Sequence, residues 1–272
     1  MPRALRAAVG GVVYHVLNRA NARQTIFHGP QEYRLFEQIL AQAHERVAMR
    51  TIGFCIMPNH WHLVLWPRED GDLSEFMRWM TVTHTQRHHA RHKTVGTGHI
   101  YQGRFKAFPV QRREPNLSDR QAGVVIGANP LWPLLRYVEQ NPLRAGLTDR
   151  AEQWPWGSLS RRAYEGAGFM VAGPPREPVP LSEPPTPLPT DWLDYVNRTP
   201  LEKELTDIRA CVSRGCPFGD PDWVKQTAKQ LGLESTLRSR GRPLTPKKGS
   251  GTFFTDSGVE KATELPFAPP LG

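Results

Sequence analysis

The sequence has 272 residues, of which 39% are hydrophobic, so it can bury the core of one ordinary domain and a smaller module. Its formal net charge of +9 favours a polyanionic partner, and nucleic acid fits best because Arg and Lys alternate with aromatic residues. No apolar run approaches the roughly 20 residues that span a bilayer, so we expect no membrane partner. The cysteines lack paired spacing and no secretory leader is recognisable, so we expect a cytoplasmic protein.

The front half of the sequence alternates between strand and helix patterns. In chain order the expected elements are a strand over 11–18, a helix over 31–49, strands over 50–57 and 61–66, a helix over 73–91, a strand over 105–111 and a helix over 131–145. The two middle strands form a hairpin around Pro58 and Asn59. This order is the split β-α-β pattern, so we predict a ferredoxin-like α+β fold, an antiparallel sheet with helices on one face.

The rear half differs in composition. We predict a first domain over 1–165, a Pro-rich linker over 166–190, a helical basic C-terminal module over 191–245 and a disordered tail over 246–272. Residues 112–132 lack periodicity and are interpreted as an insertion before the last helix of the first domain.

His60 and His62 lie on one face of the predicted strand over 61–66 and its turn, because alternate side chains share a face, whereas Trp61 points into the other layer. Two neutral imidazoles on a rigid strand can chelate a transition metal, with a third ligand from elsewhere. Two alternatives are histidines without a function at a strand edge and a structural zinc site. The zinc site is disfavoured because no pair of closely spaced cysteines accompanies the histidines.

Tyr137 and Asn141 are four residues apart, so they stack on one face of the predicted helix over 131–145. A phenol and an amide oxygen placed in this way can supply a nucleophile and a metal ligand together. A free phenol has a pKa near 10, so its ionisation at pH 7 costs about 4 kcal/mol, which a metal or an arginine must offset. The alternative is an ordinary half-buried core tyrosine.

Four motifs occur in order: NHWHLVL over 59–65, GHIYQGRFKAF over 98–108, RYVEQNPLRAGL over 136–147 and WPWGSL over 154–159. This series resembles the REP-associated tyrosine transposases, which are HUH single-tyrosine insertion-sequence transposases. The resemblance covers residues 1–165, and 190–245 less strictly. It implies that the first domain is an HUH single-tyrosine transposase domain.

The resemblance also implies roles for individual residues. His60 and His62 match the HUH metal ligands, Tyr137 matches the catalytic tyrosine, and Asn141 matches the third ligand, with Gln140 as the fallback. The metal implied is Mg²⁺ or Mn²⁺.

The function implied is a metal-dependent single-stranded DNA endonuclease and strand transferase that forms a 5′-phosphotyrosine intermediate on REP-type hairpins. Related proteins act as monomers or as homodimers, and a DNA substrate places the protein at the nucleoid. The alternative is a catalytically decayed protein that still binds DNA hairpins, and the insertion over 112–132 favours it. A relaxase or replication initiator ranks last, because the sequence has no P-loop.

Residues around the fourth strand are candidates for DNA binding. Arg104, Lys106 and Arg112, together with Tyr101, could bind phosphates and stack on bases of a single strand, or they could form a basic strand face over core aromatics. Arg240 and Arg242 flank a glycine, as in an AT-hook core that enters the minor groove, although a basic linker has the same appearance.

His84, His88 and His92 are spaced at four-residue intervals and form a stripe along the predicted helix over 73–91 and its end. A polar face that touches phosphates is favoured over a metal site, because no acidic or cysteine partner joins the stripe in the sequence.

Overall fold

The computed structural model describes residues 8–113, 129–165 and 179–238. Four strands form one antiparallel sheet in the order β2-β3-β1-β4. The strands are β1 (Val13–Arg19), β2 (Met49–Met57), β3 (His60–Pro67) and β4 (Lys106–Val110). The helices that accompany them are α1 (Pro30–Arg46) and α2 (Asp72–His92), then α4 (Leu131–Glu139), α5 (Asn141–Arg144), α6 (Ser158–Glu165), α7 (Trp192–Asn197), α8 (Glu202–Arg214) and α9 (Pro221–Gln230). The strand order and the two crossover helices confirm the predicted ferredoxin-like α+β fold.

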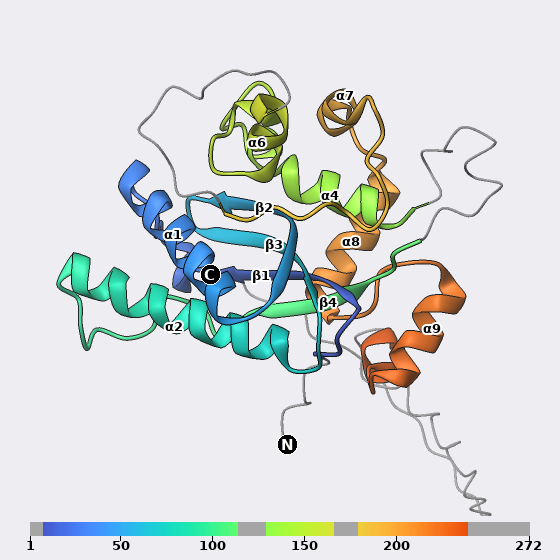
Figure 1. Ribbon diagram of the computed structural model, residues 1–272, viewed down its shortest axis with the longest axis horizontal. Helices are drawn as coiled ribbons and strands as arrows, with labels where there is room; N and C mark the ends of the chain where they lie inside the picture. Colours follow the sequence, from blue (N-terminus) through green and yellow to red (C-terminus); the bar gives the residue numbers. More distant parts are fainter. Residues whose placement is uncertain (1–7, 114–128, 166–178, 239–272) are drawn as a thin grey trace, which may run out of the picture. The chain divides into compact units, whose positions relative to one another are not determined.

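The helices lie on both faces of the sheet, which differs from the prediction of a single helical face. Helices α1 and α2 cover one face, and α4 lies against the other (Figure 1). The reason is visible in β2, where every residue except Arg50 is buried. A strand that is apolar on both faces needs a layer on each side of the sheet.

Close packing of the second layer depends on Gly53 in β2. A Cβ atom at this position would lie 2.8 Å from Cδ2 of Leu135 in α4 and 3.2 Å from Oγ of Ser158 in α6. The missing side chain therefore lets both helices approach the strand. The strand also has a bulge here, between Thr51 and Gly53.

The predicted helix over 131–145 is broken into α4 and α5 at Gln140. Pro142 has no N–H to donate to the carbonyl of Val138, so the α-helical ladder stops there. The side-chain amide of Asn141 donates to this carbonyl instead, with Nδ2 3.3 Å from the oxygen. Asn141 thus lies at the junction of α4 and α5, four residues after Tyr137.

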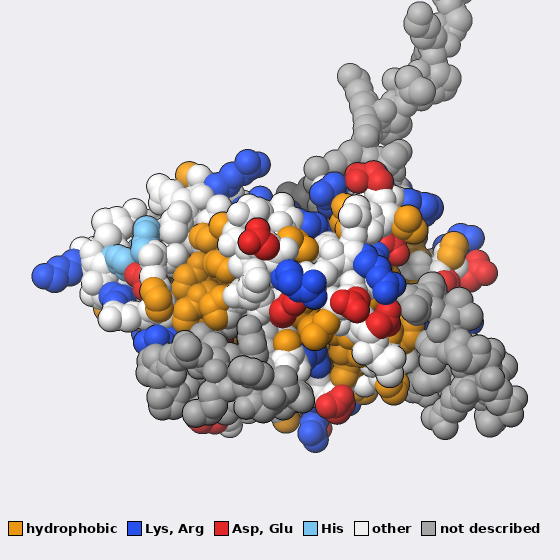
Figure 2. Space-filling model, turned by 90° about the horizontal axis from the view of Figure 1, so that it is seen from above, with side chains coloured by type: hydrophobic (Ala, Val, Ile, Leu, Met, Phe, Trp, Pro, Cys, Tyr) orange, Lys and Arg blue, Asp and Glu red, His pale blue; other side chains and the backbone are white. Residues whose placement is uncertain are grey.

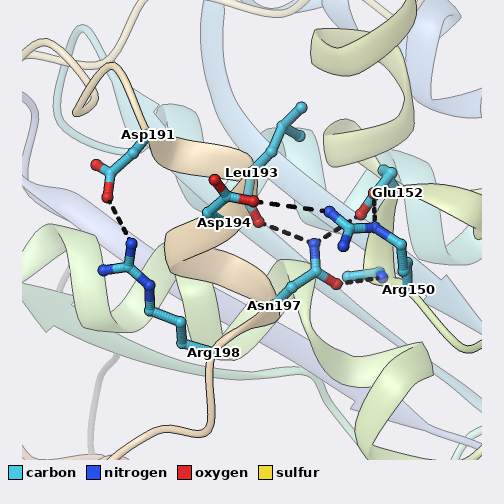
Figure 3. Close-up of polar contacts among 8 residues, drawn as sticks. Arg150, Glu152, Asp191, Leu193, Asp194, Asn197 and Arg198 are labelled. Atoms are coloured by element: carbon cyan, nitrogen blue, oxygen red, sulfur yellow. Dashed lines mark hydrogen bonds and ion pairs between the residues drawn. The ribbon is translucent and has the colours of Figure 1, made fainter.

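Helix α7 is fastened to the turn that follows α5. Oδ1 of Asn197 accepts from the backbone N–H of Ala151 at 2.9 Å, and its Nδ2 donates to Glu152 at 2.7 Å (Figure 3). Trp192, Tyr195 and Val196 are buried in the same core as the sheet and α4. The helices expected after residue 190 are therefore present, and they pack directly on the layer that holds Tyr137.

Parts of four predicted segments lie outside the described residues. These are 114–128 of the insertion, 166–178 of the linker, 239–245 of the C-terminal module and the whole tail over 246–272. The domain boundaries stay predictions. Among the described residues, no helix combines the length and apolar character needed to cross a membrane.

On the face that supports α1 and α2, a buried hydrogen-bond chain joins three elements. Nε1 of Trp61 in β3 donates to the hydroxyl of Tyr101 at 2.9 Å, and this hydroxyl lies 2.6 Å from Nδ1 of His84 in α2. Burial lowers the pKa of His84 to about 3. The imidazole is therefore neutral in the folded protein at neutral pH.

We expect acid to destabilise the fold through His84. Its pKa is depressed on folding, so below about pH 6.5 the unfolded chain binds a proton that the native state excludes, and stability falls by about 1.4 kcal/mol per pH unit. In His84→Gln, the difference in unfolding free energy between pH 7.5 and pH 5 should shrink by about 2 kcal/mol, measured by urea titration. An unchanged difference would contradict this account, and His99→Gln, at an exposed position, is the control.

Candidate active site

His60 and His62 point from β3 to the face that α4 covers. In the antiparallel register His60 pairs with Arg19 and His62 with Leu17, and the centroids of the two imidazole rings are 5.1 Å apart. Trp61 between them is fully buried on the opposite face. The two histidines thus share a face, as the alternation of a strand predicts.

Both imidazoles are neutral at physiological pH. Burial, with smaller effects from Arg19 and Arg144, lowers the pKa of His60 to about 4. Burial is also the largest cause that holds the pKa of His62 well below its usual value. Neutral imidazole is the form that coordinates a metal, so the electrostatics suit the predicted role.

Each of these rings is held through its Nδ1 atom. Nδ1 of His60 lies 2.6 Å from Oδ1 of Asn59, which can only accept, so the imidazole proton is assigned to Nδ1. Nδ1 of His62 lies 2.8 Å from Nε2 of His15. Hydrogen bonds of this kind fix the tautomer and orientation of metal-binding histidines and leave Nε2 as the ligand atom.

His15 is a site residue that the sequence interpretation missed. It is fully buried in β1, its ring stacks on His62 at a centroid distance of 5.0 Å, and burial lowers its pKa to about 3. Its Nδ1 has no hydrogen-bond partner among the described residues. The one signal in the sequence is a histidine inside an otherwise apolar strand.

Tyr137 extends from α4 toward the histidines. Its ring centroid lies 5.9 Å from that of His62 and 6.3 Å from that of His15, with nearly perpendicular planes. The side chain is half-buried, and the guanidinium carbon of Arg144 lies 4.1 Å from its ring centroid. The fold therefore brings the phenol and the imidazoles together from elements far apart in the chain.

The two candidates for a third ligand have different surroundings. Nδ2 of Asn141 donates to the carbonyl of Tyr137 at 3.1 Å, so its amide oxygen is the atom left to coordinate. Gln140 is buried against α7, where its Nε2 donates to the carbonyls of Val196 and Arg198 at 2.7 and 2.9 Å. These bonds tie Gln140 to the neighbouring helix and favour Asn141 as the ligand.

The donor set fits a divalent ion that accepts mixed nitrogen and oxygen ligands, such as Mn²⁺. Within the described ranges, no group of three His, Cys, Asp or Glu side chains is arranged to hold a metal. A site made of His60, His62 and the amide of Asn141 agrees with that finding, because its third ligand is not one of these residue types.

The predicted DNA-binding residues have different environments. Arg104 and Lys106 are exposed and line a cavity of about 360 Å³ between β4 and the end of α8. Arg112 lies over the ring of Trp66, with its guanidinium carbon 5.1 Å from the centroid. Tyr101 is buried with its hydroxyl engaged by Trp61 and His84, so it offers little surface for stacking on a base. Arg240 and Arg242 lie outside the described residues.

The described side chains on the face above α4, α6 and α7 do not form one continuous basic surface. Figure 2 shows Lys and Arg side chains interspersed there with Asp and Glu, around groups of hydrophobic side chains. Among the side chains shown there, Lys and Arg do not gather into a basic patch, so Arg104, Lys106 and Arg112 are the better candidates for phosphate contacts.

The histidine stripe on α2 does have an acidic partner, so the expectation of none was wrong. Nε2 of His92 lies 2.6 Å from Oε1 of Glu32 in α1, and the rings of His88 and His92 are 4.4 Å apart. The partner comes from another helix and could not be found from spacing along α2.

The first part of the chain, which includes the paired histidines, is similar to a known protein family. Residues 8–118 match the family model described as "Transposase IS200 like". This confirms the resemblance recognised from the motifs. The match includes His60 and His62 and ends before Tyr137.

A solved structure described as a REP-associated tyrosine transposase bound to a REP hairpin is also similar. It shares 16% sequence identity, with a TM-score of 0.44, and the alignment covers 69% of this chain and 95% of that chain. No match was found among curated proteins.

Proposed function

We propose that the protein is a metal-dependent single-stranded DNA endonuclease and strand transferase, and that Tyr137 forms a 5′-phosphotyrosine intermediate. The observation that supports the proposal most is the approach of the Tyr137 and His62 rings to 5.9 Å, on the sheet face where His60 also lies. The transposase family of residues 8–118 supplies the type of reaction.

The side chains of the site have distinct tasks in this reaction. His60, His62 and Asn141 would hold Mg²⁺ or Mn²⁺, which supplies Lewis-acid polarisation of the scissile phosphate when bound. The phenol oxygen of Tyr137 forms a bond to phosphorus as the bond to the 3′-oxygen breaks. The phenol proton is lost, and the 3′-oxygen leaves as a hydroxyl after it takes up a proton. Because the covalent intermediate keeps a phosphodiester bond, a second strand can be joined without ATP.

The proposed substrate is a REP-type hairpin with a single-stranded flank. The ordered motifs support this choice, and Arg104, Lys106 and Arg112 supply positive charge near β4 for the backbone. Such a substrate would place the protein in the cytoplasm, at the nucleoid, as a monomer or a homodimer.

A cleavage assay tests the proposal. Incubation with single-stranded oligonucleotides that carry hairpins from the flanking genome, together with Mn²⁺, should give a protein–DNA adduct that survives denaturing electrophoresis. EDTA should prevent the adduct, because the neutral imidazoles then have no ion to coordinate. Tight, salt-sensitive binding without an adduct under Mg²⁺ or Mn²⁺ would contradict the proposal and support a decayed hairpin-binding protein.

A further inference from the structure

We propose that Arg144 and Arg19 form a guanidinium clamp for the scissile phosphate, an inference that rests on the proposed function. Arg144 is in α5, three residues after Asn141 and seven residues after Tyr137. Its Nη2 donates to the carbonyl of Tyr137 at 3.0 Å, and its guanidinium carbon lies 4.1 Å from the centroid of the Tyr137 ring. The positive charge is thus held beside the phenol by the backbone of the same helical segment.

Arg19 approaches the same site from the sheet. It is the last residue of β1 and pairs in register with His60, so both side chains leave the sheet on the same face. Arg144 contacts the ring of Tyr137, which lies 5.9 Å from the ring of His62. The two arginines therefore approach the histidines from different elements, one from β1 and one from α5.

Neither arginine has a counter-charge in the described part of the chain. Nη1 of Arg144 and Nε of Arg19 are buried without a hydrogen-bond partner. Three other largely buried arginines each pair with a carboxylate: Arg136 with Glu204, Arg161 with Glu37 and Arg162 with Glu139.

A shielded guanidinium without a carboxylate is costly, because it loses hydration without gaining an ion pair. Burial accordingly lowers the pKa of Arg144. Such a charge is suited to an anion that arrives with the substrate. A phosphodiester brings one negative charge and two non-bridging oxygens, which match the planar donors of a guanidinium.

The clamp would act on the substrate phosphate directly. It would hold the non-bridging oxygens as the Tyr137 oxygen approaches phosphorus, and it would stabilise the charge that develops in the transition state. In this role Arg144 and Arg19 are catalytic residues, and they complement the neutral imidazoles, which contribute no charge of their own.

The first test measures DNA binding in EDTA, so it needs neither metal nor cleavage. For a single-stranded hairpin oligonucleotide, the slope of log K against log salt should fall by about 0.7 in Arg144→Gln and in Arg19→Gln. Arg46→Gln, at an exposed position on the opposite face, is the matched control and should keep the wild-type slope. Wild-type slopes in both site variants would overturn the clamp, even if the wild-type protein cleaves DNA. A reduced slope without any adduct would support the clamp and overturn the proposed cleavage.

The second test locates the contact at the scissile phosphate. Once the cleavage position is mapped, Arg144→Gln should slow adduct formation by about 10²–10³-fold on ordinary DNA, and Arg144→Lys should restore part of the rate. On DNA with a neutral methylphosphonate at that position, wild type and Arg144→Gln should react at similar rates, because the charge that the guanidinium contacts is gone. An equal loss on both substrates would show that Arg144 only supports the structure, and would overturn the clamp.

Discussion

Replacing Tyr137 with phenylalanine should abolish the covalent protein–DNA adduct and leave hairpin affinity nearly unchanged. The phenol is the nucleophile in the proposed reaction, and removal of a nucleophile typically costs about 10⁴-fold or more in rate. The substitution keeps the aromatic ring that faces His62 at 5.9 Å and Arg144 at 4.1 Å, so the surrounding site should persist. Denaturing electrophoresis of labelled DNA measures the adduct, and fluorescence anisotropy measures the affinity.

Tyr195→Phe is the matched control for this experiment. Tyr195 is a buried tyrosine of α7 whose ring lies under Arg136, outside the cluster of histidines. The control should form the adduct at close to the wild-type rate. If Tyr137→Phe formed the adduct in wild-type yield, Tyr137 would not be the nucleophile.

Replacing Glu139 with alanine should destabilise the fold by about 3–5 kcal/mol, the range found when one partner of a buried ion pair is removed. The carboxylate accepts from Oγ of Ser158 at 2.6 Å, from Nε of Arg162 at 3.2 Å and from Nε1 of Trp192 at 2.8 Å. It therefore ties α4, which holds Tyr137, to α6 and α7. Alanine would leave these three donors without their acceptor.

Urea unfolding of Glu139→Ala measures this loss, and Glu139→Gln separates charge from hydrogen bonding, because glutamine keeps one acceptor oxygen. Glu152→Ala is the comparison at a more open site, where the carboxylate pairs with the half-exposed Arg150 and accepts from Asn197, and it should cost clearly less than Glu139→Ala. A cost for Glu139→Ala no greater than that of Glu152→Ala would refute the view that the carboxylate anchors the tyrosine helix.

The sequence predicted the elements that depend on short-range periodicity. The strand and helix order, the shared face of His60 and His62, and the stacking of Tyr137 before Asn141 follow from periods of two and about four residues. Boundaries were less accurate. The helix predicted over 31–49 ends at Arg46, because Val47 takes an extended conformation that leads into β2.

Other features depend on strand register and on packing between distant elements. His15 and Arg19 reach the site only because β1 pairs with β3 in one register, which no local pattern specifies. Arg144 reaches Tyr137 because the chain breaks at Gln140 and starts a new helical turn. Tyr101 was a candidate for stacking on bases, but it is buried. An aromatic residue among basic ones gives the same sequence pattern whether its ring is buried or available to a base.

Mass spectrometry of the trapped adduct tests the central claim most directly. After digestion with nuclease and trypsin, the account predicts a nucleotide joined through its 5′-phosphate to the peptide from Tyr137 to Arg144, and on no other peptide. Attachment to a different residue, or linkage through a 3′-phosphate, would contradict the assignment of this phenol and the histidine face opposite it as the site of strand cleavage.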